Sequence, residues 1–526
     1  MLNLIAIGFV CLLSLTIARR HLVSSDTGWD ELAKSIPTVG LQKERFRWAH
    51  ATLRSLLRTK EWVCAGYEEY ARHNQAFIVP SLDRGAVVVL APQQVKQIYS
   101  LPEHILDAHN TQNETVQARW TFIDQDVADN MALHVNVIRN QMTRGLGQLV
   151  PILAAEISHA LRRSWGDGSE WKEITIWSSC LEMIAGVGNA VFFGEPLCRD
   201  EALLNSLKNH GMSVFAGATI INCTPKPLKP IVGSVARVVC YYFSTRAAAK
   251  CLPLVKERLE HTARLKVDAA YAWRPPKDAV QWVIDECYAT GQPAQLAPRR
   301  VALRLLILNV ISLHSTSFTL QNAILDLASM DPSDGVVGLL REECRSVLAK
   351  SGSTLWTYEA VKKLRLLDST VRESMRLTPF ANLGIPRTVV HPDGLVLRQG
   401  SKDNVESEVH IPQGTMLALP MAALQRDETL YPDPDRFDVF RFTHGKDNKG
   451  ARSALAVDEG FLGFGFGQHA CPGRFFAINE IKLVLAEMLL SYDIERLGPR
   501  PPSLSLIWLN YPAHKATVRV RRRKGV

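Results

Sequence analysis

The stretch from Phe461 to Ala477 constrains this chain more than any other segment. Glycines at 463, 465 and 467 precede a single cysteine, and Cys471-Pro472-Gly473 then opens an apolar helical run. Glycines let a backbone pass close to a flat, bulky group because they carry no Cβ. A cysteine at a helix start has its thiolate stabilised by backbone N–H groups and by the positive end of the helix. Together these features favour an axial thiolate ligand of haem iron inside an apolar shell.

The sequence of this loop allows two other interpretations. The residues also suit a tight turn before a helix that buries a free cysteine. In addition, Gly465-x-Gly467-x-x-Ala470 fits a relaxed dinucleotide-binding pattern. The dinucleotide interpretation needs a preceding strand rich in Val and Ile, which is missing here, so we reject it.

The loop resembles the haem-binding loop of the cytochrome P450 monooxygenases at Phe464, Gly467, His469, Cys471 and Gly473. The continuation from residue 472 to 477 is similar to the version found in fungal members. The resemblance implies haem b as the cofactor, with Cys471 as the axial iron ligand. The family usually has arginine, in contact with a haem propionate, where this chain has His469. A histidine can donate the same hydrogen bond, but its charge near neutral pH depends on its surroundings.

Composition is that of a globular protein: the 526 residues are 47% hydrophobic and 21% charged. The ten cysteines form no Cys-x-x-Cys, which predicts reduced thiols on the cytosolic side of a membrane. Net charge is +9, but no nucleic-acid recognition motif accompanies it, so we expect no nucleic-acid partner. An acidic protein or an anionic membrane surface fits the charge better. We interpret the tail from Arg519 to Lys524 as a solvated basic end.

Residues 2–18 form an apolar run that ends at Arg19-Arg20. A membrane-spanning helix needs about 20 residues, with about 17 near the lower limit. The arginine pair favours a cytoplasmic location for the chain that follows. We therefore predict a single-pass anchor over residues 1–20 in the endoplasmic reticulum membrane, with a cleaved signal peptide as the alternative. Residues 21–42 are expected to form a linker, and residues 43–526 a cytoplasmic catalytic domain.

Periodicity predicts helices over residues 43–74, 134–144, 300–330, 364–377 and 473–490. Short strands are predicted at 77–79 and 86–90 as a hairpin, and at four places between 387 and 419. A last hairpin is expected to pair 504–509 with 516–520. The chain is thus predicted to be mainly α. The resemblance implies the cytochrome P450 fold, a large helical body with a small β subdomain, behind an N-terminal transmembrane helix.

The predicted helix 300–330 is apolar nearly all round, with the polar cluster His314-Ser315-Thr316 at its centre. Hydroxyls there could simply bond to the carbonyl groups of the preceding turn. In the family the central helix carries an acid–alcohol pair beside the oxygen-binding face of haem. The resemblance places His314 at the acid and Ser315 at the alcohol. The candidate catalytic residues, expected to deliver protons, are therefore Ser315 and His314 together with the neighbouring Thr316.

Three further sets of residues follow from the resemblance. Glu373-x-x-Arg376 and Arg436 of Pro434-Asp435-Arg436-Phe437 resemble the family's buried Glu/Arg/Arg network, which supports the cysteine loop. Arg387 resembles the strand arginine that holds a propionate. His134 and Arg139 are candidates for propionate contacts from the helix 134–144, although the usual Trp-x-x-x-Arg is missing.

The implied reaction is insertion of one oxygen atom from O2 into a lipophilic substrate. Electrons would come from NADPH through a P450 reductase that docks near Cys471. The fungal style of the loop and the predicted anchor point to secondary metabolism, with a terpenoid, meroterpenoid or indole-diterpene as substrate. Two alternatives remain: a haem-thiolate isomerase or dehydratase that needs no external electrons, and a non-enzymatic haem sensor.

Overall fold

The computed structural model describes residues 28–524, except 125, 126, 128, 130, 225–227, 354, 401–406 and 444–451. The predicted anchor over residues 1–20 lies outside the described residues.

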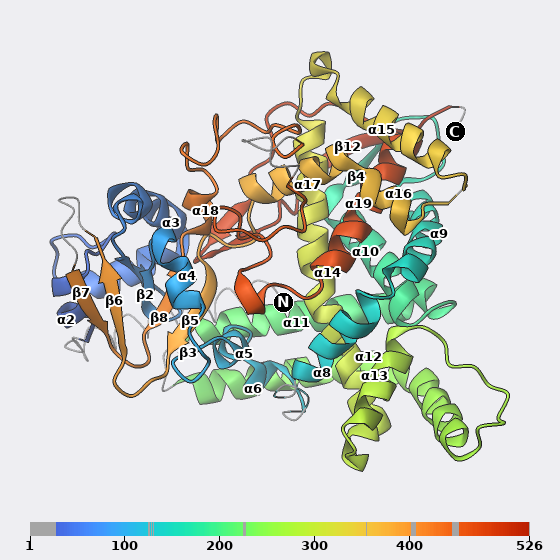
Figure 1. Cartoon of the computed structure of the whole chain (residues 1–526), viewed down its shortest axis with the longest axis horizontal. Helices are drawn as coiled ribbons and strands as arrows, with labels where there is room; N and C mark the ends of the chain where they lie inside the picture. The colour runs from blue at the N-terminus through green and yellow to red at the C-terminus, as the bar shows by residue number, and fades with distance from the viewer. Residues whose placement is uncertain are drawn as a thin grey trace.

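Helix α14 (Pro298–Ala328) crosses the middle of the molecule, and the other large helices surround it (Figure 1). Most of its side chains are buried, as an apolar helix in a protein core requires. Within the described residues it is the only helix long and apolar enough to cross a membrane, and 83% of that apolar window is buried inside the protein. α14 is therefore a core helix, which confirms the prediction for residues 300–330.

The helical body contains α8 (Met131–Asn136), the π-helix η3 (Val137–Met142), α9 (Leu146–Trp165), α10 (Ile176–Phe192), α11 (Glu201–Asn222), α12 (Lys229–Val267), α13 (Ala279–Ala289), α15 (Val336–Lys350), α16 (Tyr358–Lys363), α17 (Arg365–Leu377) and α19 (Arg474–Ser491). Helices on the sheet side and along the connection to the body are α2 (Gly28–Ser35), α3 (Arg47–Glu69), α4 (Val95–Tyr99), α5 (His109–Thr115), α6 (Ala118–Thr121) and α18 (Met421–Leu424). The chain is thus mainly α, as predicted.

The largest sheet has five strands in the order β1-β2-β8-β5-β3 and lies to the left of the large helical body in Figure 1, together with α2, α3 and α4. These strands are β1 (Phe77–Ser81), β2 (Gly85–Val89), β3 (Leu106–Asp107), β5 (Gly384–Val389) and β8 (Met416–Leu419), and a separate hairpin pairs β6 (Leu395–Gln399) with β7 (Ser407–Ile411). β1 and β2 form the predicted hairpin, with Phe77 opposite Val89. α3 packs on this hairpin at Gly66, where an added Cβ would lie 2.2 Å from the Phe77 ring. The small β subdomain is therefore built by local pairing plus this close helix contact.

Part of the predicted linker over residues 21–42 is packed structure. Residues 28–35 form α2, and Leu32 and Ile36 are buried in the apolar core of the sheet. Thr38 then forms a bridge with Ile78 of β1. The packed part of the chain therefore includes residues before position 43, because their apolar side chains complete the core on the sheet.

The predicted C-terminal hairpin between 504–509 and 516–520 is wrong. The first segment folds back on itself as β10 (Leu504–Leu506) and β11 (Leu509–Tyr511), with Ile507 at φ +53° in the turn. β12 (Thr517–Arg522) instead pairs with β4 (Lys172–Thr175) and β9 (Tyr492–Ile494). Alternation in the sequence identified the strands but not their partners, because β4 lies far away along the chain.

The basic tail is exposed to solvent at Arg519, Arg521 and Lys524, but its arginines form ion pairs. Arg519 is 3.1 Å from Glu495, and Arg521 is 3.3 Å from Asp493. Arg522 forms an ion pair with Asp167. Pairing of β12 within its sheet brings these carboxylates opposite the arginines, so much of the local positive charge is balanced.

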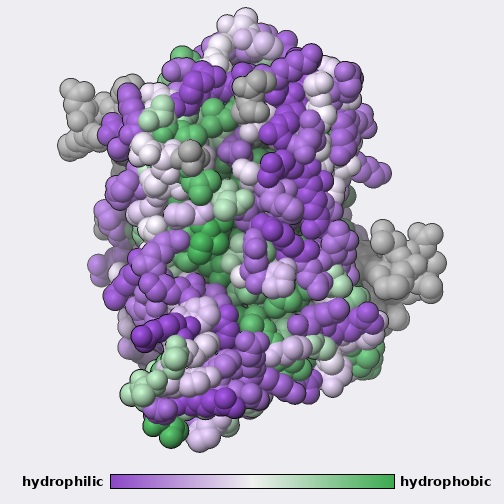
Figure 2. Space-filling view, turned by 90° about the vertical axis from the view of Figure 1, so that its right-hand side faces the viewer, coloured by the Kyte–Doolittle hydropathy of each residue, from purple (hydrophilic) through white to green (hydrophobic). Residues whose placement is uncertain are grey.

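Figure 2 shows the face that lies on the right-hand side of Figure 1, where α9 and α15 are found. Apolar residues form an irregular band between hydrophilic ones. Exposed large apolar side chains on these two helices are Ile152 and Leu339. Single apolar side chains of this kind are normal on a protein surface and do not indicate a binding site.

Candidate active site

The cysteine loop folds back on itself before α19. Gly465 (φ +81°) and Gly467 (φ +64°) have left-handed backbone conformations that other residues rarely adopt. These turns let the N–H of Cys471 donate to the carbonyl oxygen of Phe464 at 2.8 Å. Two of the three glycines in the predicted motif are therefore required by the backbone conformation.

Cys471 lies directly before α19 and is largely enclosed. Burial raises the pKa of its thiol, whereas the backbone N–H groups of Gly473 and Arg474 and the charge of Arg474 act in the opposite direction. Those N–H groups stabilise the anionic sulfur, as expected of a cysteine at a helix start. A thiol with this environment is suited to bind a metal cation, because the charge of the metal removes the thiol proton.

α14 contacts α17 and α19. The middle of the helix has an exposed side, although the turns before and after it are buried. Ile311 is 42% exposed, and Ser315, one turn later, is exposed too. The Ser315 hydroxyl donates to the Ile311 carbonyl at 3.2 Å, and the Thr319 hydroxyl donates to the Ser315 carbonyl at 3.1 Å. Accessible hydroxyls on a core helix indicate an internal space. The sequence analysis missed Thr319, although its spacing of four residues from Ser315 places both on one side of the helix.

The side chain of His314 packs against α11. Its ring packs edge-on to Phe215 of α11, with centroids 5.3 Å apart, and a Cβ added at Gly211 would lie 2.6 Å from His314 Nε2. Burial lowers the pKa of His314 to about 4, so the imidazole is neutral near pH 7. Thr316 is buried. The three predicted catalytic residues are therefore not together: within the cluster, Ser315 has the accessible hydroxyl.

Charged side chains gather beside the cysteine loop. His469 Nε2 is 2.9 Å from Glu103 Oε1, and the Arg139 guanidinium donates to the Gln468 carbonyl at 3.2 Å. Arg387 is almost fully buried, with its guanidinium 5.2 Å from the centre of the Tyr99 ring. Burial and then the charge of Arg387 lower the pKa of His469, and Glu103 opposes this. The structure thus brings Arg139, Arg387 and His469 together, at an edge of the loop suited to carboxylate groups.

His134 lies apart from this cluster. It is fully buried on α8, and burial and then the charge of Arg304 on α14 lower its pKa to about 3. A neutral, enclosed imidazole here is part of the packing between helices, and its proposed propionate contact stays a prediction.

Taken together, these residues fit a haem. Cys471 would supply a sulfur ligand with N–H groups directed at it, and α14 has an accessible side at Ile311 and Ser315. Arg387 and Arg139 would hold the propionates, because guanidinium groups bind carboxylates through paired N–H donors.

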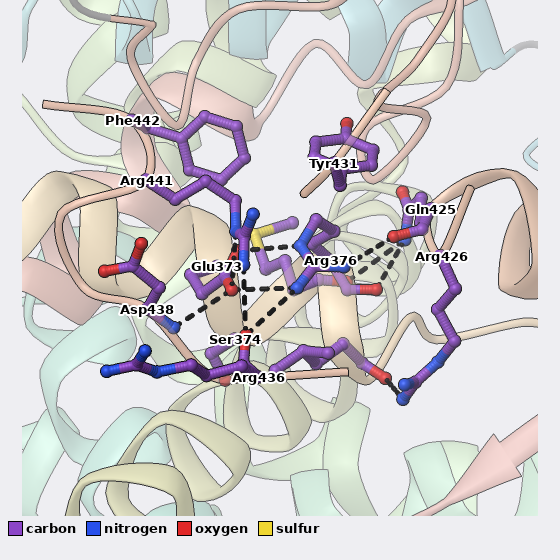
Figure 3. A network of polar contacts seen from close by, with 12 residues as sticks. Glu373, Ser374, Arg376, Gln425, Arg426, Tyr431, Arg436, Asp438, Arg441 and Phe442 are labelled. Carbon is purple, nitrogen blue, oxygen red and sulfur yellow. Dashed lines mark hydrogen bonds and ion pairs between the residues drawn. The ribbon is translucent and has the colours of Figure 1, made fainter. Parts of the chain in front are cut away.

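Behind the loop, Glu373 is the centre of a buried polar network (Figure 3). Its carboxylate accepts from Arg376 at 2.7 and 2.8 Å, from Arg441 Nε at 3.0 Å, and from the Asp438 N–H at 3.1 Å. Arg376 also donates to the Gln425 carbonyl at 2.6 Å, and the Gln425 side-chain oxygen accepts from the N–H of Leu462 at the start of the cysteine loop. The network therefore reaches the loop through one amide side chain.

The prediction that the Arg436 side chain joins this network is wrong. Arg436 is exposed and takes part through its carbonyl oxygen, which accepts from Arg441 at 3.2 Å. Arg441 also donates to the carbonyls of Pro432 and Asp433. The pair Arg-Phe occurs at 436–437 and again at 441–442, and the second occurrence is the one whose arginine faces α17.

Arg372, one turn before Arg376, was not identified from the sequence. It is fully buried, donates to the carbonyls of Ser453 and Ala456 at 2.7 and 2.8 Å, and pairs with Asp458 at 2.8 Å. Its guanidinium lies 3.9 Å from the centre of the Phe461 ring. α17 thus holds the chain on the N-terminal side of the cysteine loop with one arginine and supports the loop itself with the Glu373 network.

The segment after α17 forms a wall beside the exposed side of α14. Phe380 is 41% exposed, and its ring packs edge-on to Phe318 of α14, with centroids 5.5 Å apart. Asn510 of β11 donates to the Pro379 carbonyl at 2.8 Å, and Asn382 donates to the Ser505 hydroxyl at 2.7 Å. The β10–β11 hairpin therefore fixes the backbone of this wall.

Comparison with known proteins agrees with this geometry. The family model described as "Cytochrome P450" matches residues 71–516. Cytochrome P450 monooxygenase okaG of Penicillium ochrochloron is 38% identical over 514 residues, covering 93% of this chain and 94% of the relative. Cytochrome P450 monooxygenase gloP of Glarea lozoyensis is 28% identical, covering 98% and 96%. Cytochrome P450 monooxygenase htyF of Aspergillus rugulosus is 31% identical, covering 88% and 68%.

The chain belongs to the cytochrome P450 family and is a cytochrome P450 monooxygenase. Membership implies a haem-thiolate cofactor, a redox partner and a small-molecule substrate.

Proposed function

We propose that this enzyme inserts one atom of O2 into a lipophilic secondary metabolite, with a terpenoid, meroterpenoid or indole-diterpene as the first substrate classes to test. Cys471 is the axial ligand in this proposal, and Arg387, Arg139 and His469 hold the propionates. The observation that carries it is the combination of the cysteine loop with the exposed hydroxyl of Ser315 on the core helix.

The haem, when bound, supplies the activation of dioxygen. Ser315 and Thr319 then place two hydroxyls one turn apart, able to hold water and pass a proton toward the oxygen-binding side. Phe380 and Ile311 give the space an apolar wall, which favours a lipophilic substrate and limits water. The product then depends on which C–H bond this wall holds near the reacting centre.

Electrons are proposed to come from NADPH through a P450 reductase on the side of the cysteine loop. An N-terminal anchor over residues 1–20 would keep the enzyme in the endoplasmic reticulum membrane with the catalytic domain in the cytoplasm. The apolar run in the sequence and the lipophilic character of the space support this location.

The test uses microsomes that carry the full chain and a matched reductase, supplied with isotopically labelled O2, NADPH and lipophilic extracts from fungal cultures. We expect an NADPH-dependent product with one labelled oxygen, and the Cys471→Ala variant serves as the control. A product formed without NADPH or label would contradict oxygen insertion. Haem uptake and substrate-induced spectral change without any product would favour the sensor.

An isomerase or dehydratase is the second candidate. The observation that favours it concerns His314, which occupies the position of the family's acid on α14. Its imidazole is neutral and packs against α11. Without a carboxylate there, proton delivery depends on the hydroxyls. Omitting NADPH and reductase separates the two functions, because only the isomerase or dehydratase keeps its turnover.

A further inference from the structure

One fully buried arginine on α14 has no carboxylate partner. Arg304 lies about three turns before Ser315, and its side chain is completely enclosed. Arg372 and Arg376 are equally buried, but each of them pairs with a carboxylate. Arg387 is almost as buried, and a haem propionate is its proposed partner. Among the buried arginines of the described chain, Arg304 is therefore the one whose positive charge has no partner assigned to it.

The guanidinium of Arg304 is only partly hydrogen-bonded. Its Nη2 group donates to the side-chain oxygen of Gln295, in the 3-10 turn η6 (Pro293–Leu296), at 2.6 Å. Its Nε and Nη1 groups are buried and have no hydrogen-bond partner. The carboxylate of Asp124 acts on Arg304 through its charge, but it pairs with Arg300 at 2.8 Å. A positive charge with two free nitrogen donors is thus enclosed in the core.

The other polar groups around Arg304 are neutral. They come from α8 and α13, and α13 contacts both α8 and α14 (Figure 1). Cys287 of α13 lies beside the guanidinium. Burial raises the pKa of its thiol to about 11, although Arg304 acts in the opposite direction, so the thiol keeps its proton near pH 7. His134 of α8 is fully buried near Arg304, and neither of its ring nitrogens forms a hydrogen bond of good geometry.

This arrangement has an excess of donors and lacks negative charge. A buried charge without a partner is strongly destabilising, and buried donors in native proteins are nearly always satisfied by protein, water or an ion. A water molecule would accept one hydrogen bond but would leave the charge unbalanced. A small anion satisfies both needs, because the two guanidinium groups and the thiol are all donors. Complete enclosure of Arg304 favours a monatomic anion over phosphate.

We propose that Arg304 binds a halide ion, chloride under cellular conditions, where α8, α13 and α14 meet. The Nε and Nη1 groups of Arg304 donate to the ion, and the thiol of Cys287 and one ring N–H of His134 are the further donors. The ion then links three helices that come from separate parts of the chain. This site is separate from the proposed oxygen insertion and does not depend on it.

The test measures thermal unfolding of the full, haem-loaded chain while chloride replaces gluconate at constant ionic strength. An ion that binds only the folded state raises Tm by mass action. For 526 residues, Tm should rise by about 1 °C for each tenfold increase in chloride above its dissociation constant. Arg304→Met, which removes the charge and the donors but keeps an unbranched side chain, should abolish this dependence. Arg264→Met, the same change at an exposed site near the end of α12, should retain it.

A second measurement does not depend on the folding of Arg304→Met. Crystals of the unaltered chain grown in bromide should show anomalous scattering from an ion bonded to Nε and Nη1 of Arg304. Water at that place would overturn the proposal. Equal chloride dependence in the unaltered chain and in Arg304→Met would also overturn it, because the salt would then act elsewhere.

Loss of haem from Arg304→Met, with no chloride dependence in the unaltered chain, would contradict the proposal as well. A haem carboxylate would then be the partner of Arg304. None of these measurements uses NADPH or turnover, so failure of the halide site would leave the oxygen-insertion proposal untouched.

Discussion

Replacing Arg441 by leucine tests whether the second Arg-Phe pair, and not the first, completes the Glu373 network. The substitution removes a hydrogen bond of 3.0 Å to a carboxylate that is fully buried, and three bonds to backbone carbonyls. Glu373 keeps Arg376 as a partner, so its charge is not left alone.

Arg441→Leu is expected to lower the free energy of unfolding by about 3 kcal/mol. This lies between the contribution of one hydrogen bond to a charged group and the loss of stability when one partner of a buried ion pair is removed. Arg436→Leu is the matched control: its exposed side chain should contribute within about 0.5 kcal/mol. Arg441→Lys should fall between the two, because an ammonium keeps the charge but cannot bond to a carboxylate and several carbonyls in one plane.

The assay is thermal unfolding of the full chain together with the fraction of protein that retains haem. With an unfolding entropy of about 2.1 cal/mol/K per residue, 526 residues give about 1.1 kcal/mol/K, so the expected fall in Tm for Arg441→Leu is about 3 °C. Haem retention should fall with it, because Gln425 links this network to Leu462. If Arg436→Leu lowers Tm as much as Arg441→Leu, or if Arg441→Leu has no effect, the reasoning is refuted.

Three further predictions concern the site and the core. Ser315→Ala should keep haem and substrate binding but divert NADPH electrons to peroxide, and unchanged coupling measured as product per NADPH would contradict its role. Cys471→Ala should lose the thiolate spectral signature, whereas Cys344→Ala, a change at a buried cysteine outside the loop, should keep it. Burial raises the pKa of Glu480 to about 8, above its ordinary 4.5. Between these two pH values the folded state keeps a proton that the unfolded state releases. The free energy of unfolding therefore falls as pH rises from about 5 to 8. Glu480→Gln, which mimics the protonated side chain, should match the parent at pH 5 and be about 1–3 kcal/mol more stable at pH 8, measured by denaturant unfolding; equal stability at both pH values would count against it.

Local patterns in the sequence predicted the parts that are set locally. The apolar helix 300–330, the hairpin of β1 and β2 and the glycine turns before Cys471 each follow from neighbouring residues, and the structure contains all three. Their hydrogen bonds join residues close in the chain, so composition and spacing carry the necessary information.

The parts that the sequence did not predict depend on distant partners. β12 pairs with β4, more than three hundred residues earlier, so alternation alone could not identify its partner. Arg436 and Arg441 have the same local context, Arg followed by Phe, and only the approach of α17 distinguishes them. His314 was expected beside the oxygen-binding side, but the space left by Gly211 on α11 accepts its ring instead.

α17 and the segment that follows it form one continuous piece of backbone between the cysteine loop and the pocket wall. Arg372 and Glu373 fix one end of this piece, and Asn382 and Asn510 fix the other. Phe380 lies between the two fixed ends with an accessible ring. If this wall faces the substrate, exchange of the side chain at position 380 should change substrate preference while the backbone stays fixed. Insertions or deletions between residues 372 and 382 would instead shift the cysteine loop and the wall at once.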